Sequence, residues 1–126
     1  MPDISGATFH HVVSAKDGHL LVDAGALAVD VRPRASQERD GVAKRAIGTD
    51  RNNVAAYFGD GSAERHAELG AKDQPIVLLC GSLYGSQPVL QQLAERGYTR
   101  LYQVEGGYRA WTHEHASRAE AGAAGA

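Results

Sequence analysis

Short apolar runs alternate along this chain with segments whose apolar residues recur at helical spacing. The apolar runs cover residues 9–13, 26–31, 46–47, 76–79 and 100–104. Runs of this length and composition are typical of strands that a parallel sheet buries on both faces. The alternation of strand and helix therefore predicts one α/β domain, with a mostly parallel sheet of about four or five strands and helices on both faces.

The first predicted helix begins at a recognisable cap. Ser14 is followed three residues later by Asp17, a spacing that resembles a capping box. Helical periodicity from there places three apolar residues on the buried side of the helix, namely Leu20, Leu21 and Ala24.

Two later segments are expected to lie outside the core of the predicted domain. Residues 63–69 have a helical pattern, with His66 among charged neighbours and therefore expected to be exposed. From Ser117 onward the chain has no large apolar residue. We therefore expect a domain of residues 1–116, followed by a flexible Ala/Gly-rich tail of residues 117–126.

The candidate chemistry lies where the apolar run 76–79 ends on Cys80, the only cysteine of the protein. A small loop, residues 81–85, separates it from a predicted helix that Ser86 is placed to cap and Gly97 to stop. The loop amides and the positive end of that helix would surround the sulfur and favour its anionic form. Position alone leaves a second interpretation open, a buried structural cysteine, because free cysteine is among the most buried residue types.

Three stretches, in order along the chain, resemble the single-domain rhodaneses. Residues 26–33 read A-L-A-V-D-V-R-P, similar to the strand followed by D-V-R of that family, and Cys80 opens its loop after a strand as the catalytic cysteine of rhodaneses does. Residues 97–111 read G-Y-T-R-L-Y-Q-V-E-G-G-Y-R-A-W, similar to the family ending G-Y-x-x-V-x-x-L-x-G-G-x-x-A-W. The resemblance covers about residues 12–113 and implies a rhodanese-like domain of a divergent branch.

The resemblance implies a sulfurtransferase in which Cys80 is the nucleophile. Its thiolate would take sulfane sulfur from a small donor, thiosulfate or another persulfide or thiosulfonate, and carry it as a persulfide to a thiol or protein acceptor. The hydroxyls of Ser82 and Ser86 would either add donors or serve as turn former and cap. The substrate- and persulfide-binding loop would consist of Gly81, Ser82, Leu83, Tyr84, Gly85 and Ser86.

One departure from the family pattern lies inside this loop. Gly85 stands where rhodaneses commonly have an arginine, so the loop lacks a bidentate clamp for an anionic donor such as thiosulfate. Arg51, in the loop after the third predicted strand, is the first candidate to supply that charge, and Arg32 is the second. Tyr84 at the mouth of the loop would either contact a bulkier or less anionic donor or cover the start of the helix, and an exposed loop aromatic favours ligand contact.

Asp30 and Arg32 follow the second predicted strand, just before Pro33. Ligands of open α/β sheets bind at this edge. The resemblance to rhodaneses implies that the pair forms polar contacts that shape the rim of the site and hold neighbouring loops; a structural ion pair is the other interpretation. Beyond it the family usually has a glutamate four residues before G-H-I-P-G-A. This chain has Gln37, and residues 41–46 read G-V-A-K-R-A.

Composition narrows the function classes. The 126 residues, 43% hydrophobic and 22% charged with net charge −2, carry no basic footprint for nucleic acid and no polybasic membrane patch. One cysteine cannot form an internal disulfide, and the first residues lack the pattern of a signal peptide, so a cytoplasmic location is expected. Six scattered histidines and one cysteine offer no metal-ligand spacing, and no cofactor is expected.

Three other functions stay open at this point. A rhodanese-like binding or regulatory module would have lost turnover together with the loop arginine. A cysteine phosphatase or arsenate reductase shares the loop architecture, but it needs an arginine that closes a slightly longer loop, and position 86 is serine. A redox sensor would use the lone thiol directly.

Overall fold

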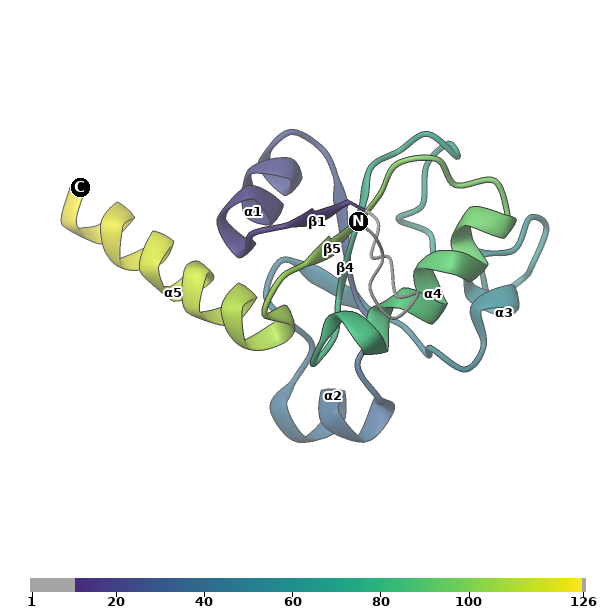
Figure 1. The fold of residues 1–126 in the computed structure, drawn as a ribbon, viewed down its shortest axis with the longest axis horizontal. Helices are drawn as coiled ribbons and strands as arrows, with labels where there is room; N and C mark the ends of the chain where they lie inside the picture. Colours follow the sequence, from purple (N-terminus) through teal and green to yellow (C-terminus); the bar gives the residue numbers. More distant parts are fainter. Residues whose placement is uncertain (1–10, 126) are drawn as a thin grey trace, which may run out of the picture.

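The computed structural model describes residues 11–125 and contains a five-stranded parallel sheet with helices on both faces (Figure 1). The strands lie in the order β1-β5-β4-β2-β3, and each pairing is parallel. The predicted α/β class is confirmed; residues 9 and 10 of the first predicted strand lie outside the described residues. The strands are β1 (Val12–Val13), β2 (Leu27–Asp30), β3 (Ala46–Gly48), β4 (Ile76–Leu79) and β5 (Leu101–Val104).

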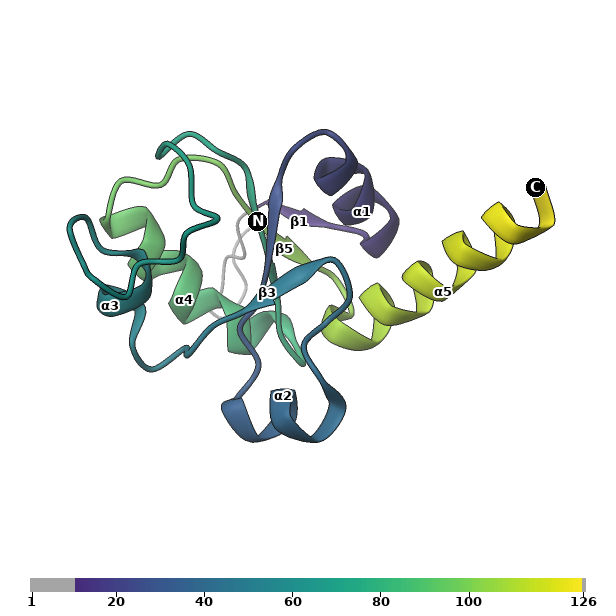
Figure 2. The same cartoon turned by 180° about the vertical axis from the view of Figure 1, so that it is seen from behind.

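Of the helices within residues 11–125, four form two layers, one on each face of the sheet, and a fifth lies at the end of the sheet (Figures 1 and 2). α1 (Ala15–Asp23) and α5 (Gly107–Gly125) cover one face. α3 (Val54–Phe58) and α4 (Leu83–Glu95) cover the other. α2 (Arg34–Asp40) follows β2 and lies at the edge where the strands end, below the sheet in Figure 1.

Side-chain alternation along the central strand β4 decides the direction in which the cysteine points. Ile76, Leu78 and Cys80 belong to the core that packs against α3 and α4. Val77 and Leu79 belong to the core that packs against α1 and α5. All four residues of β4 are fully buried, as expected for a strand covered on both faces. Cys80 therefore directs its thiol to the α4 side of the sheet.

α1 begins as predicted but buries a different face. The Oγ of Ser14 accepts a hydrogen bond from the N–H of Asp17 at 3.0 Å. The predicted burial of Leu20 and Ala24 is wrong, since both are exposed, and Leu21 is half-buried. The buried residues of α1 are Ala15, Gly18 and His19.

The rotation of α1 follows from its close packing on α5. A Cβ on Gly18 would lie 3.0 Å from the indole of Trp111, so glycine is what allows the two helices to approach. The ring of His19 stacks on the same indole with centroids 3.6 Å apart. Shape at the helix contact therefore outweighs the apolar pattern of the sequence.

Two peripheral segments differ from their predictions. Residues 63–69 form turns, so the predicted helix there is wrong. Residues 117–125, predicted as a tail, continue α5 as a helix that extends away from the sheet (Figure 1). Arg118 in this extension pairs with the carboxylate of Asp23 at 2.7 Å. Alanine-rich sequence is a good helix former even where it buries little.

Candidate active site

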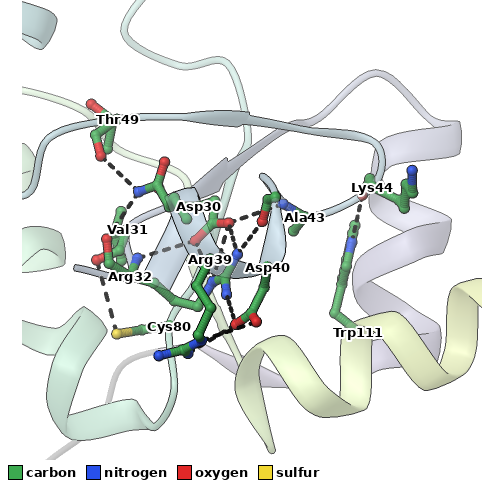
Figure 3. A network of polar contacts seen from close by, with 12 residues as sticks. Asp30, Val31, Arg32, Arg39, Asp40, Ala43, Lys44, Thr49, Cys80 and Trp111 are labelled. Atoms are coloured by element: carbon green, nitrogen blue, oxygen red, sulfur yellow. Dashed lines mark hydrogen bonds and ion pairs between the residues drawn. The ribbon is translucent and has the colours of Figure 1, made fainter. Parts of the chain in front are cut away.

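Cys80 stands at the carboxyl end of β4, as predicted, and its thiol is largely enclosed. The residue is 5% exposed, and Sγ lies 3.9 Å from the carbonyl oxygen of Val31, the residue after β2 (Figure 3). The Cys80 carbonyl oxygen accepts a hydrogen bond from the N–H of Tyr108 at 2.7 Å. The strand end and the start of α5 therefore hold the cysteine backbone in place.

α4 begins sooner after the cysteine than the sequence predicts. Its first residue is Leu83, and its N-cap is Ser82, whose side chain makes no capping hydrogen bond. The prediction that Ser86 caps the helix is therefore wrong. Because only Gly81 and Ser82 separate Cys80 from α4, the positive end of the helix dipole lies next to Cys80.

Ser86 fastens α4 to the sheet. Its buried hydroxyl lies 2.6 Å from Oε1 of Gln103 on β5 and donates a hydrogen bond to it. Nε2 of Gln103 in turn donates to Oε1 of Gln87 at 2.7 Å. Ser86 therefore has a structural partner, whereas Ser82 is exposed at the rim of the site.

Arg51 reaches the sulfur from the loop after β3. Its Nη1 lies 3.7 Å from Sγ of Cys80, and its Nη2 donates to the carbonyl oxygen of Gly85 at 3.2 Å. The guanidinium of Arg51, the first candidate to supply the charge missing at position 85, therefore lies beside the thiol of Cys80.

Gly85 leaves the space that the sulfur needs. A Cβ at this position would lie 2.4 Å from Sγ of Cys80 and 3.9 Å from Nη1 of Arg51. A contact of 2.4 Å is far inside van der Waals distance, so any side chain at position 85 would displace the sulfur or the helix.

Asp30 and Arg32 form a buried ion pair at the rim (Figure 3). Nη2 of Arg32 lies 2.7 Å from Oδ2 of Asp30, and the side chains are 4% and 0% exposed. Nη2 also donates to the carbonyl oxygen of Gly41 at 2.7 Å, and the guanidinium lies 3.6 Å from the ring centroid of Tyr108. Asp30 Oδ2 accepts from the N–H of Ala43 at 2.9 Å. Protein partners thus occupy Arg32, and it is a poor candidate for an anion contact.

The loop that carries Arg51 is anchored at Thr49. Its carbonyl oxygen accepts a hydrogen bond from Nε2 of Gln37 at 2.9 Å, and its Oγ1 lies 2.8 Å from Nε2 of His66. The ring of His66 stacks on Tyr57 with centroids 5.0 Å apart, so the prediction that His66 is exposed is wrong. Burial lowers the pKa of His66, which favours its neutral form.

The turn before α5 packs directly on the candidate loop. Gly107 has φ 58°, and a Cβ there would overlap the carbonyl group of Cys80. Gly107, the first residue of α5, is therefore required by a close approach of two backbones, and Gly106 before it has φ 80°. Tyr84, the second residue of α4, is 72% exposed.

The described residues offer little for other kinds of site. Residues 11–125 contain no cluster of three or more His, Cys, Asp and Glu side chains suited to a metal ion. Among the same residues, no helix has the length and hydropathy needed to cross a membrane.

Fold and site together define an α/β domain whose candidate nucleophile is a single cysteine between a central strand and a helix N-terminus. The sequence matches the rhodanese-like domain family over residues 14–114, and the chain belongs to that family. A thiosulfate sulfurtransferase GlpE of Coxiella burnetii is 27% identical over 86 residues, covering 68% of this chain and 71% of the relative. GlpE of Vibrio cholerae is 38% identical over 57 residues, covering 45% and 54%.

Solved structures share the fold. A Rhodopseudomonas palustris protein of unknown function, described as a possible tyrosine phosphatase, matches with a TM-score of 0.67 at 19% identity, over 91% of this chain and 96% of that one. The polysulfide-sulfur transferase homodimer of Wolinella succinogenes matches with a TM-score of 0.61 at 19% identity, over 83% and 74%. At these identities the likeness concerns the fold alone.

Proposed function

We propose that this protein is a sulfurtransferase that carries sulfane sulfur as a persulfide on Cys80. The observation that carries the proposal is the position of Arg51, whose Nη1 lies 3.7 Å from Sγ of Cys80 at the N-terminal end of α4. A guanidinium and a helix N-terminus both favour negative charge at the sulfur. Membership of the rhodanese-like family and relatives named thiosulfate sulfurtransferase support the same activity.

Sulfur loading is a displacement at sulfur. The Cys80 thiolate attacks the outer sulfur of thiosulfate, a bond forms between Sγ and that sulfur, and the bond to the sulfonate sulfur breaks. The electron pair of the broken bond leaves with sulfite, and Cys80 becomes a persulfide anion. The charges balance, because the thiolate monoanion and the thiosulfate dianion give the persulfide monoanion and the sulfite dianion. The outer sulfur of thiosulfate is already sulfane sulfur, so the step needs no external oxidant.

Arg51 takes the role that a loop arginine has in other rhodaneses. The thiolate, the incoming donor and the departing sulfite are all negative, and their mutual repulsion raises the barrier. A guanidinium within reach of the sulfur offsets that repulsion most where the charges crowd together, in the transition state. An anionic donor therefore depends on Arg51 more than a neutral donor does.

A second candidate function, a binding or regulatory module, rests on two observations. Cys80 is only 5% exposed, and position 85 lacks the arginine common in the family. A module of this kind would bind a partner and take up no sulfur. A phosphatase is disfavoured, because the arginine that would close its loop is replaced by Ser86, whose hydroxyl is bonded to Gln103.

Intact mass spectrometry after incubation with sulfane donors tests the proposal. With thiosulfate the protein should gain one sulfur atom. A neutral organic trisulfide RSSSR should give the same gain, because Cys80 takes its central sulfur, the thiolate RS⁻ is displaced, and RS⁻ then removes the remaining R–S group as the disulfide RSSR. The added sulfur should be lost again when a thiol is added. The Cys80→Ser variant should gain none. Uptake of no sulfur from either donor would contradict the proposal and favour the binding module, and uptake of oxygen from peroxide alone would indicate a redox sensor.

A further inference from the structure

A hollow of about 310 Å³ lies beside the candidate loop, between α2 and the start of α5. Gly81, the residue after Cys80, lines it from the loop, and Arg39 and Arg109 line it from the two helices. Arg51 approaches the sulfur from the α4 side, together with Gly85. The hollow is therefore a second approach to the loop, on the side that faces α5.

The loop backbone is bare where it borders the hollow. A Cβ built on Gly81 would meet no heavy atom within 4 Å, and Gly81 is absent from the glycines with positive φ. Neither crowding nor backbone conformation within the protein therefore requires glycine at position 81. The open space over Gly81 gives a ligand access to the loop one residue from the sulfur.

The hollow has an excess of positive charge. Arg109 is exposed and makes no hydrogen bond or ion pair with the described residues. Arg39 is 69% exposed and pairs with Asp40 at 2.9 Å. Arg32, at the base, is neutralised by buried Asp30. Three arginines against the two carboxylates leave one net positive charge, carried by the most accessible side chains.

We propose that this hollow binds the carboxylate end of a small thiol that accepts the sulfur from Cys80. This inference rests on the proposed sulfurtransferase function. A volume of about 310 Å³ lies at the lower end for small-molecule pockets, about 300–1,000 Å³, and suits a compact organic acid better than a protein segment. Arg109 and Arg39 would hold the carboxylate by charge-assisted hydrogen bonds, and the thiol group would lie over Gly81.

The transfer step is a second displacement at sulfur. The acceptor thiolate attacks the outer sulfur of the Cys80 persulfide and forms a new S–S bond. The bond between the outer sulfur and Sγ breaks, and its electron pair stays on Sγ, so Cys80 returns to the thiolate and the acceptor leaves as a persulfide. Anchoring the carboxylate raises the effective concentration of the thiolate at the outer sulfur.

Transfer from the loaded protein tests the inference. Mercaptosuccinate carries two carboxylates and 2-mercaptoethanol none, so each protein is compared with both thiols. The double variant Arg39→Gln, Arg109→Gln should transfer sulfur to mercaptosuccinate about tenfold more slowly than wild type, the loss expected for a charge-assisted hydrogen bond. Its transfer to 2-mercaptoethanol should fall by no more than about twofold. Equal losses for both thiols, or no loss for either, would overturn the inference.

The control is Arg100→Gln, which removes one exposed arginine immediately before β5, at the opposite edge of the sheet. Its rates of sulfur transfer to mercaptosuccinate and to 2-mercaptoethanol should both equal those of wild type.

A binding measurement separates failure of this inference from failure of the proposed function. Succinate, which has the carboxylates but no thiol, is titrated into the Cys80→Ser protein and followed by the amide NMR signals of Gly81 and Tyr108. Saturable shifts that the Arg39→Gln, Arg109→Gln substitutions weaken about tenfold support the carboxylate site, whether or not wild type takes up sulfur. Absence of such shifts overturns the site, even if Cys80 is loaded.

Discussion

Arg51 is bonded to the turn that contains Gly85. Its Nη2 donates to the Gly85 carbonyl oxygen at 3.2 Å, while its Nη1 lies 3.7 Å from Sγ of Cys80. A side chain at position 85 would collide with that sulfur. The glycine at position 85 and the guanidinium of Arg51 therefore form one arrangement, in which glycine leaves room for the sulfur and Arg51 supplies the positive charge beside it.

Substitution of Gly85 tests this arrangement. Gly85→Ala places a methyl group where the sulfur lies, at 2.4 Å, and should slow loading of Cys80 by about tenfold or more while lowering stability by about 1–3 kcal/mol. Gly85→Arg restores the side chain common in rhodaneses and should slow loading too, since it carries the same Cβ. Loading rates come from time-resolved intact mass, and urea unfolding checks the fold. A folded Gly85→Ala protein that loads at the wild-type rate would refute the arrangement.

Gln37 is a second departure from the family pattern with a structural reason. Its Nε2 donates to the carbonyl oxygens of Asp30, Arg32 and Thr49 at 3.2, 2.9 and 2.9 Å. A carboxylate in the same place would face three carbonyl oxygens with no hydrogen to donate. Gln37→Glu should therefore destabilise the protein by about 2–4 kcal/mol in urea unfolding at neutral pH.

The control for that substitution is the same chemical change at an exposed position. Gln91 is exposed on α4, and Gln91→Glu should alter the free energy of unfolding by no more than about 0.5 kcal/mol. If both variants are equally stable, the hydrogen bonds that Gln37 donates do not stabilise the protein, and the explanation of this departure from the family pattern is wrong.

His19 should make the protein less stable in mild acid. It is fully buried, and Nη1 of Arg45 lies 2.9 Å from its Nδ1, so Nδ1 accepts and Nε2 donates to the carbonyl oxygen of Trp111 at 3.1 Å. Burial, with a smaller contribution from the Arg45 charge, lowers the pKa of His19. Below about pH 6.5 the unfolded chain therefore binds more protons than the folded one, and the free energy of unfolding falls as pH drops.

Urea unfolding between about pH 7.5 and about pH 5.5 measures this effect. His66, whose pKa burial also lowers, contributes in the same direction. His19→Gln, which keeps an acceptor and a donor but does not titrate, should flatten the pH dependence. A slope unchanged in this variant would show that His19 titrates alike in both states.

The apolar pattern predicted the sheet well because buried strands have a local signature. β4 and β5 appear at their expected positions. Arg51, named as a candidate in the loop after the third predicted strand, lies beside the sulfur because the carboxyl ends of parallel strands meet at one edge of the sheet.

Features that depend on distant partners could not be predicted. The hydroxyl of Ser86 suits a helix cap as well as its bond to Gln103, and only the tertiary packing selects the second. A glutamine within the apolar run of β5 was the one available signal of a buried partner. The contact between Thr49 and His66 joins two segments whose sequences give no sign that they meet. Gly18, and not Leu20, lies on the buried face of α1 because only glycine fits against Trp111 there.

The central claim is that Arg51 supports sulfur transfer to Cys80, and the rate of loading measures it most directly. Wild type, Arg51→Lys, Arg51→Gln and the control Arg100→Gln are each loaded from thiosulfate and from a neutral organic trisulfide and followed by intact mass. Arg51→Gln should load from thiosulfate about tenfold or more slowly than wild type, with Arg51→Lys between the two. Loading from the trisulfide should change by no more than about twofold. If Arg51→Gln loads from thiosulfate as fast as wild type, the guanidinium beside the sulfur has no part in the reaction.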